Sequence, residues 1–257
     1  MGTIARHFSR IARIYGKVRT TDLEPVFFIR DRLKSAGEVI AADVGCGDGR
    51  YGLKLLQHLE NLRHLYCVDP SKGMLKQVER HGRRYGLRNF ETKVGLADDL
   101  PLGDESLDCV FSLNAVHLFD LRRFLVESLR VLREGGTLFV YTRTKSQNAQ
   151  SIWGKYFPKF REKETRLYDM EELKATIRNA YGLALEEVKL FEYQRNTSLA
   201  RLRAQAKDHH YSTFHFYAKE EFKTALRRFT EVLKNRFEDS ENIPWTDGNV
   251  LLVARKV

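Results

Sequence analysis

The stretch "ADVGCGDGRYG", Ala42–Gly52, determines how this chain is interpreted. It places four glycines within eight residues, directly behind a short apolar run. Glycine has no Cβ, so a turn built from glycines lets a ligand approach the backbone closely. The stretch therefore predicts a buried strand, a ligand-binding turn and a helix in succession.

Two nucleotide-binding patterns fit this turn poorly. A phosphate-binding P-loop needs Gly-Lys-Ser/Thr, but Gly49 is followed by Arg50. In the dinucleotide pattern GxGxxG the third glycine would fall on Arg50, which weakens the case for NAD or FAD. The third glycine of this pattern normally lets the helix pack closely on the strand. With Arg50 in its place, we expect that close contact to be absent. What remains is an acidic-x-Gly-x-Gly-x-Gly pattern of Asp43, Gly45, Gly47 and Gly49.

Strands and helices are expected to alternate around this turn. Ser71 and Asp120 are predicted helix N-caps, and Gly135-Gly136 is predicted to end the helix that begins after Asp120. Such alternation predicts a parallel sheet covered on both faces, with ligands bound beyond the C-terminal ends of the strands. The expected strands are 39–45, 62–70, 89–97, 106–116 and 137–143, and the expected helices include 23–36, 50–59 and 72–85.

The pattern loosens after Arg143, where a polar, aromatic-containing loop is expected to run to Tyr168. No linker is visible, so we expect one domain over residues 1–257. Its predicted parts are N-terminal lid helices (1–37), a cofactor-binding core (38–144) and two cap insertions (145–168 and 196–248). Further helices are expected at 170–181, 199–207 and 219–237, and further strands at 185–193 and 249–257.

Four blocks of sequence carry a family resemblance. The glycine turn is followed by "VDPS" at the end of the second strand, by "GLADDLPL", and by "SLDCVFSLNAVHLF" with "LRVLREGGTLFV". In this order and spacing the chain, from about Val39 to Tyr141, resembles the class I S-adenosylmethionine-dependent methyltransferases. Its closest branch looks like the ubiquinone/menaquinone C-methyltransferases and their small-molecule relatives. The resemblance implies an α/β fold: a Rossmann-like, doubly wound, mostly parallel seven-stranded sheet with helical cap insertions.

The resemblance also implies a cofactor site for S-adenosyl-L-methionine. Asp69 would accept both ribose hydroxyls in a bidentate pair, and Asp98 would take the adenine amino group. An ordinary solvated acid is the alternative at Asp69. The implied cofactor-binding residues are Tyr15, Arg19, Asp43, Gly45, Cys46, Gly47, Asp69, Pro70, Met74, Ala97, Asp98 and Asn114.

The methyl acceptor is expected to be a small organic molecule. Methyltransferases that act on exocyclic amines of adenine or on glutamine resemble one another in an Asn/Asp-Pro-Pro-aromatic motif. This chain has Asn114-Ala115-Val116-His117 instead, and no Pro-Cys nucleophile is present, which argues against a nucleic-acid acceptor. His117 is a candidate base. It could equally pack against the cofactor.

Two aromatic segments are candidates for the acceptor pocket. "KDHHYSTFHFY" contains His210 and Tyr211, predicted to be catalytic or substrate-lining, and "SIWGKYFPKF" could form a second wall. The alternatives are a plain helix junction and a loop packed on the core. Adjacent histidines without a third marked ligand do not predict a metal site.

The N-terminal segment "TIARHFSRIARIYGKV" separates apolar and basic residues at helical spacing. It could be a lid that places Tyr15 and Arg19 over the cofactor, a helix lying on a membrane surface, or a packing helix. The net charge of +10 also has several explanations. The simplest is a solvated basic surface, and the alternatives are binding to nucleic acid, to an anionic membrane or to an anionic substrate. The oligomeric state is not indicated.

Three cysteines, Cys46, Cys67 and Cys109, form no CxxC pair and no zinc spacing. Each lies in or beside an apolar run, as expected for a small buried side chain. The sequence also has no apolar run near the ~20 residues of a membrane span and no secretory h-region. We therefore expect a reduced, cytoplasmic setting.

Overall fold

The computed structural model describes residues 20–257, so the predicted roles of Tyr15, Arg19 and the N-terminal lid helix lie outside the described part. The chain divides into two compact units. Unit 1 takes in the described residues up to Thr142 together with Glu171–Lys189 and Val250–Val257. Unit 2 consists of Arg143–Met170 and Leu190–Asn249. The expectation of one domain with two cap insertions stays a prediction.

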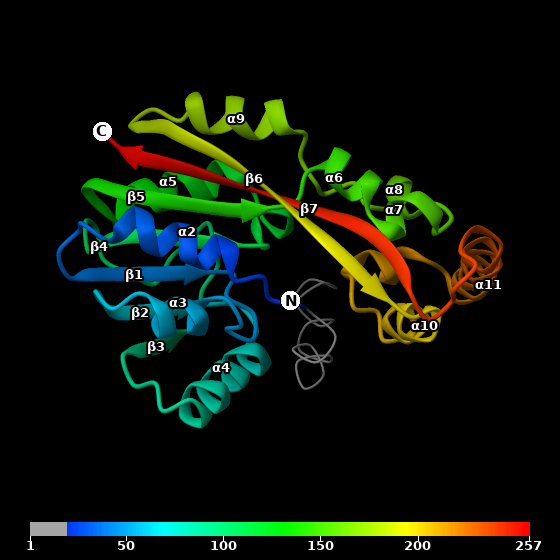
Figure 1. Ribbon diagram of the computed structural model, residues 1–257. Helices are drawn as coiled ribbons and strands as arrows, with labels where there is room; N and C mark the ends of the chain where they lie inside the picture. The colour runs from blue at the N-terminus through cyan, green and yellow to red at the C-terminus, as the bar shows by residue number, and fades with distance from the viewer. Residues whose placement is uncertain (1–19) are drawn as a thin grey trace. The chain divides into compact units, whose positions relative to one another are not determined.

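The sheet has seven strands in the order β3-β2-β1-β4-β5-β7-β6 (Figure 1). The neighbours β1–β2, β1–β4, β2–β3 and β4–β5 are parallel, and β5–β7 is antiparallel. The mostly parallel seven-stranded sheet is therefore confirmed. The strands are β1 (Val39–Val44), β2 (Leu62–Val68), β3 (Phe90–Lys93), β4 (Leu107–Leu113), β5 (Leu132–Thr142), β6 (Leu183–Thr197) and β7 (Ile243–Lys256).

Helices connect the parallel strands of unit 1, and their caps follow the sequence. Ser71 accepts a hydrogen bond from the Met74 backbone N–H, and Asp120 accepts from those of Arg122 and Arg123, so both predicted caps are confirmed. α2 contacts α3 and α3 contacts α4. Figure 1 draws α2 and α3 in front of the sheet and α5 behind it. The helices are α2 (Glu24–Leu33), α3 (Gly52–His58), α4 (Lys72–Arg84), the 3-10 turn η1 (Val116–Leu118), α5 (Leu121–Val131) and α9 (Met170–Arg178).

The prediction that Gly135-Gly136 ends a helix is wrong. α5 ends at Val131, and β5 begins at Leu132, so both glycines lie within the strand. Gly135 has a φ of +72°, and a Cβ on Gly136 would lie 2.8 Å from the Arg133 carbonyl oxygen. The pair therefore bends the start of a strand rather than capping a helix.

Strands β6 and β7 are longer than expected. β6 runs from Leu183 to Thr197 and β7 from Ile243 to Lys256, and each contributes residues to both units. The added end of β7, residues 244–248, is exposed or half-buried and carries polar residues that obscure the strand pattern. Hydropathy therefore identified only their most apolar parts.

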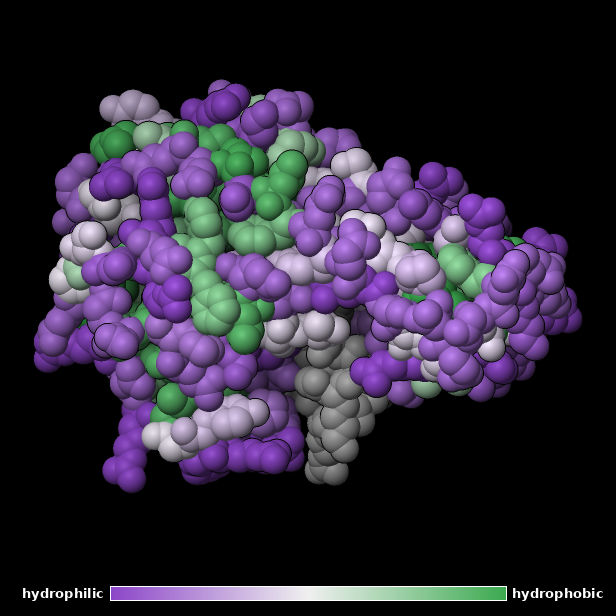
Figure 2. Space-filling model, viewed as in Figure 1, coloured by the Kyte–Doolittle hydropathy of each residue, from purple (hydrophilic) through white to green (hydrophobic). Residues whose placement is uncertain are grey.

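Unit 2 is helical between these strands, and the expected loop from residue 144 to Tyr168 is wrong. This segment forms α6 (Lys145–Gln150), α7 (Ile152–Tyr156) and α8 (Phe160–Lys163), each shorter than two turns. α10 (Leu199–Lys207), η2 (Ser212–Phe216) and α11 (Lys219–Arg236) complete the unit. On the face drawn in Figure 2, hydrophilic residues dominate the surface. No helix in the part from residue 20 onward is long and apolar enough to cross a membrane.

Candidate functional site

The glycine turn between β1 and α3 has the backbone that its sequence predicts. Gly45, Gly47 and Gly49 have φ values of +73°, +56° and +78°, in the left-handed region that costs a residue with a Cβ roughly 1–2 kcal/mol. The turn is tied to β2, since the backbone N–H groups of Gly45 and Cys46 both donate to the Val68 carbonyl oxygen. These contacts hold the turn at the C-terminal end of the sheet.

Three of the glycines allow close packing within the protein. A Cβ on Gly45 would lie 2.5 Å from the Cβ of Ala115, and one on Gly49 would lie 3.0 Å from Val78. A Cβ on Gly52, in the first turn of α3, would lie 2.8 Å from Asp43 Oδ2 and 3.2 Å from Leu65. The expected lack of a close helix-to-strand contact is therefore wrong, because Gly52 provides it two residues after Arg50.

Gly47 differs from its neighbours because it faces open space. Among residues 20–257, no heavy atom would lie within 4 Å of a Cβ built on it. Its backbone N–H donates to Asp69 Oδ2 at 3.0 Å, while Asp69 Oδ1 accepts from the Ser71 N–H at 2.8 Å. Asp69 thus joins the turn to the end of β2, and only 9% of the residue is exposed. The open side of Gly47 lets a ligand approach the backbone, and the adjacent carboxylate can accept hydrogen bonds from hydroxyl groups.

Asp43 is a deeply buried acid of the site, with 1% of its surface exposed. Burial, and then the nearby Asp69 carboxylate, raise the pKa of Asp43 to about 7, against a smaller opposing effect of Arg50. Burial also raises the pKa of Asp69. A cationic ligand would relieve this cost, because positive charge favours the ionised forms.

Sequence reasoning missed Asp48 and Arg50. Asp48 is 1% exposed, and neither of its carboxylate oxygens has a hydrogen-bond partner within residues 20–257. Burial raises its pKa, while Arg50 and His81 oppose that change. The Arg50 guanidinium stacks over the Tyr51 ring, 4.7 Å from its centroid, and donates to Thr20 O. The available signal was the position of Asp48 between Gly47 and Gly49, inside the glycine turn itself.

The other predicted cofactor residues lie in unit 1, with Met74 inside α4. Ala97 and Asp98 follow β3, which ends at Lys93, so the strand predicted to run to Ala97 is four residues too long. Asn114 directly follows β4 with a φ of +63°, and its N–H donates to the Tyr141 carbonyl oxygen at 2.6 Å. The Asp98 carboxylate lies 3.6 Å from the Arg123 guanidinium, and the Asp98 side chain is 32% exposed. Cys46, Met74 and Ala97 are buried, and Pro70 is half-buried. Their contacts with a cofactor stay a prediction.

The predicted catalytic residues fall in different units. His117 lies in η1 of unit 1 and is half-buried. His210 and Tyr211 lie in unit 2 between α10 and η2. His210 is 5% exposed, and its Nδ1 lies 3.1 Å from the Gln205 carbonyl oxygen. Whether any of the three takes part in chemistry stays a prediction.

The two aromatic segments of unit 2 do come together. The Trp153 ring lies 5.0 Å from that of His210 and 5.3 Å from that of Phe214. Trp153, Phe157 and Phe160 are at most 3% exposed and belong to the hydrophobic core of this unit. These rings therefore stabilise the unit by packing.

Tyr211 differs from its neighbours because it carries a polar network. The Arg143 guanidinium donates to Tyr211 Oη at 3.1 Å and lies 5.6 Å from the centre of its ring. Arg143 is also paired with Asp247 at 2.5 Å, and its side chain is only 11% exposed. A buried, charge-assisted network of this kind holds the Tyr211 hydroxyl in one orientation. Among the described residues no group of three or more His, Cys, Asp or Glu could hold a metal ion.

Residues 42–140 match the family described as methyltransferase domain. One relative is a Dictyostelium discoideum protein that is named as a methyltransferase. It is 26% identical to this chain over 155 residues, and the match covers 58% of this chain and 56% of that protein. The phthiotriol/phenolphthiotriol dimycocerosates methyltransferase 1 of Mycobacterium ulcerans is 33% identical over 112 residues, 43% of this chain and 40% of that protein. The chain thus spans about half the length of these curated relatives, or less.

A solved structure shares the fold. It is geranyl diphosphate C-methyltransferase from Streptomyces coelicolor, in complex with Mg2+, geranyl-S-thiolodiphosphate and S-adenosyl-L-homocysteine. The TM-score is 0.56 at 16% identity, covering 91% of this chain and 75% of that one. Residues 42–140 thus match the methyltransferase domain family, and the solved structure shows that the chain shares its fold.

The raised pKa of Asp43 predicts how stability without ligand depends on pH. Because the folded-state pKa of about 7 exceeds the ordinary 3.8, the folded protein holds a proton that the unfolded chain releases. This contribution is complete below pH 4 and is lost as pH rises toward 7, at up to about 1.4 kcal/mol per pH unit, and the curve then levels. Urea unfolding of Asp43→Asn and the wild type at pH 5, 6, 7 and 8 measures it.

The asparagine variant has no proton to lose at this position. Its free energy of unfolding relative to wild type should therefore grow from pH 5 to 7 and then stay constant. A difference that is constant from pH 5 to 8 would place the Asp43 pKa near its ordinary value.

Proposed function

We propose that this protein transfers a methyl group from S-adenosylmethionine to a small organic molecule. The observation that carries the proposal is the Gly47 turn, whose open side adjoins the fixed carboxylate of Asp69. The match of residues 42–140 to the methyltransferase domain supports the reaction class. The small-molecule acceptor is supported by Asn114-Ala115-Val116-His117, which lacks the two prolines of the amine-directed motif.

The residues of the turn fit the proposed cofactor. Asp69 would hold the ribose hydroxyls, Gly47 would admit the methionine portion close to the backbone, and Asp98 would meet the adenine amino group. When bound, S-adenosylmethionine supplies a methyl group on a positively charged sulfur. The buried acids Asp43 and Asp48 favour this positive charge, because a cation lowers the cost of ionising them.

The chain would contribute alignment rather than a nucleophile. Well-placed reactants gain up to roughly 7–11 kcal/mol over free encounter, so positioning alone can account for much of the rate. His117 follows Asn114 at the C-terminal end of β4, where a neutral imidazole could take a proton from the acceptor. The relatives act on different molecules by name, so the acceptor atom is not assigned.

Tyr211 is the unit 2 residue whose hydroxyl we propose to contact the acceptor. Its hydroxyl is held by Arg143, unlike the purely apolar rings around Trp153. Tyr211→Phe should lower methyl transfer by about three- to tenfold, the value of one hydrogen bond, and leave the affinity for S-adenosylmethionine unchanged. Tyr217→Phe is the matched control, since the Tyr217 hydroxyl donates to the Pro158 carbonyl oxygen in the same unit.

The experiment combines calorimetry with a methyl-transfer assay on fractionated small-molecule extracts, using S-adenosylmethionine with an isotopically labelled methyl group. We expect micromolar binding of S-adenosylmethionine, no binding of NAD, and label in a small-molecule fraction that decreases in Tyr211→Phe but not in Tyr217→Phe. Binding of NAD instead would overturn the cofactor assignment. Label found only in RNA or protein would overturn the acceptor class, and equal losses in both variants would make Tyr211 a structural residue.

A further inference from the structure

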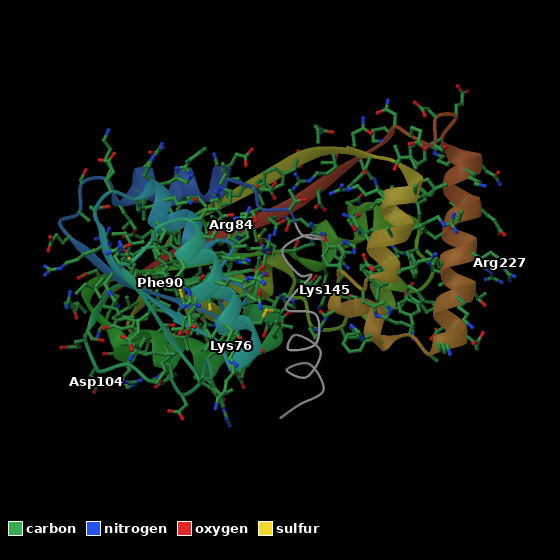
Figure 3. The ribbon with its side chains drawn as sticks, turned by 90° about the horizontal axis from the view of Figure 1, so that it is seen from below. Lys76, Arg84, Phe90, Asp104, Lys145 and Arg227 are labelled. Carbon is green, nitrogen blue, oxygen red and sulfur yellow. The ribbon has the colours of Figure 1, made fainter. Side chains whose placement is uncertain are left out.

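Helix α4 presents a row of basic side chains to solvent. Lys72, Lys76, Arg80, Arg83 and Arg84 are all exposed, and Arg88 follows the helix with the same exposure. At 3.6 residues per turn, the five helical positions fall within an arc of roughly 120° and extend over about 18 Å. Figure 3 labels Lys76 and Arg84 along this helix. We call these six residues the α4 basic stripe.

In the described part of the chain, the charges of the stripe are not neutralised by ion pairs, and its helix contains a single acid. Within residues 20–257 none of its six members forms an ion pair. Glu79 is the one acid of α4, and it accepts a hydrogen bond from Thr92 at 2.9 Å. On α11, by contrast, Glu220 and Glu231 interrupt the basic positions, and Lys223 pairs with Glu220 at 2.8 Å.

An aromatic ring stands at the end of the stripe. Tyr85 directly follows α4 and is 52% exposed, and the Lys54 ammonium of α3 lies 5.8 Å from the centre of its ring. Cations in a row track a chain of phosphates, and an exposed ring next to them offers a surface on which an unpaired base can stack. This combination is typical of single-stranded nucleic acid binding.

The opposite face of α4 argues against insertion into a membrane. Met74, Leu75 and Val78, the apolar residues of the helix, are at most 5% exposed because they pack into unit 1. A helix that lies in a bilayer interface needs its apolar face free to enter the lipid. The α4 basic stripe can therefore attract an anionic surface only through charge.

We infer that the α4 basic stripe, with Tyr85, is a binding surface for single-stranded nucleic acid. It is separate from the proposed methyl acceptor, since it uses none of the residues assigned to cofactor or acceptor. RNA binding should therefore persist in Asp69→Ala, so failure of the proposed function and failure of this inference are distinguishable. RNA would be bound through phosphates and one stacked base, with little sequence preference.

The test uses the full chain and a fluorescein-labelled 16-nucleotide single-stranded RNA of mixed sequence, followed by anisotropy at 50, 100 and 200 mM KCl. The variant Lys76→Glu/Arg80→Glu/Arg84→Glu should weaken binding at least tenfold at 50 mM. It should also reduce the slope of log affinity against log salt by about two, because three phosphate contacts are lost. Tyr85→Leu should weaken binding about fivefold or more through lost stacking.

The matched control is Arg227→Glu/Arg228→Glu/Lys234→Glu on α11, which changes the net charge equally. Figure 3 labels Arg227 on this helix. The RNA affinity of the control variant should fall less than threefold. Equal losses of affinity in both triple variants would mean that net charge alone explains the effect, and would overturn the inference. If charge reversal on α4 lowers the urea unfolding midpoint, the corresponding glutamine variant takes its place.

Vesicles of phosphatidylcholine with phosphatidylserine provide the second arm. Vesicle binding that depends on the α4 basic stripe, with RNA binding that does not, would overturn the inference in favour of an anionic lipid surface. RNA binding that depends on both the stripe and Tyr85 supports it.

Discussion

Asp69→Ala should weaken the binding of S-adenosylmethionine by roughly 1.5–3 kcal/mol, or about ten- to 150-fold, the range for hydrogen bonds to a charged group. Two losses combine in this variant. The carboxylate that would hold the ribose is removed, and the Gly47 and Ser71 N–H groups lose their acceptor. Calorimetry with the full chain measures the change.

Two further variants separate these losses. Asp69→Asn keeps a single side-chain acceptor without the charge, so its affinity should fall between those of wild type and alanine. Asp99→Ala removes an exposed acid at another strand end and should bind the cofactor as wild type does. An affinity of Asp69→Ala equal to that of wild type would move the ribose site elsewhere.

Gly45→Ala should destabilise the fold by about 2–4 kcal/mol, whereas Gly47→Ala should cost only about 1 kcal/mol. Both acquire a Cβ at positive φ, which costs about 1–2 kcal/mol. At Gly45 the new methyl would also lie 2.5 Å from the Cβ of Ala115, so the end of β4 must shift. At Gly47 it enters open space, and the loss should appear in cofactor affinity instead.

Gly86→Ala is the control for backbone cost alone. Gly86 has a φ of +69° and, like Gly47, no heavy atom within 4 Å of an added Cβ, but it lies after α4 and away from the turn. Urea unfolding and calorimetry on the three variants should give an unstable Gly45→Ala, a stable but weakly binding Gly47→Ala, and a stable, normally binding Gly86→Ala. Normal cofactor binding by Gly47→Ala would contradict the proposed approach of the ligand.

The sequence predicted unit 1 well because its signals are local. Strands such as Val39–Val44 are continuous apolar runs, and Ser71 and Asp120 stand directly before helices that they cap. The prediction at Gly135-Gly136 was wrong because glycine can either end a helix or bend a strand. Only the pairing of β5 with β4 distinguishes these two roles. The helices around Trp153 escaped detection since each is too short to establish a helical period.

The sequence predicted the geometry of the candidate site only at positions where the residue type alone determines the backbone conformation. The positive φ values of Gly45, Gly47 and Gly49 followed from their type, because glycine adopts them readily. The burial of Asp48 and the contact of Gly52 with Asp43 depend on how α3 packs onto β1, which no local pattern encodes. For the same reason the sequence could not decide whether the rings near His210 line a pocket or fill the core.

The division of the chain limits how its two units can be exchanged. The backbone passes from one unit to the other after Thr142, Met170, Lys189 and Asn249, and the last two of these points lie inside β6 and β7. Neither unit is a single continuous segment, so recombination cannot transplant unit 2 in one event. A grafted version would need two segments exchanged at four junctions, and the two junctions inside β6 and β7 would each have to restore the register of a strand. Chains of this topology should therefore diversify by point substitution within unit 2 rather than by module shuffling.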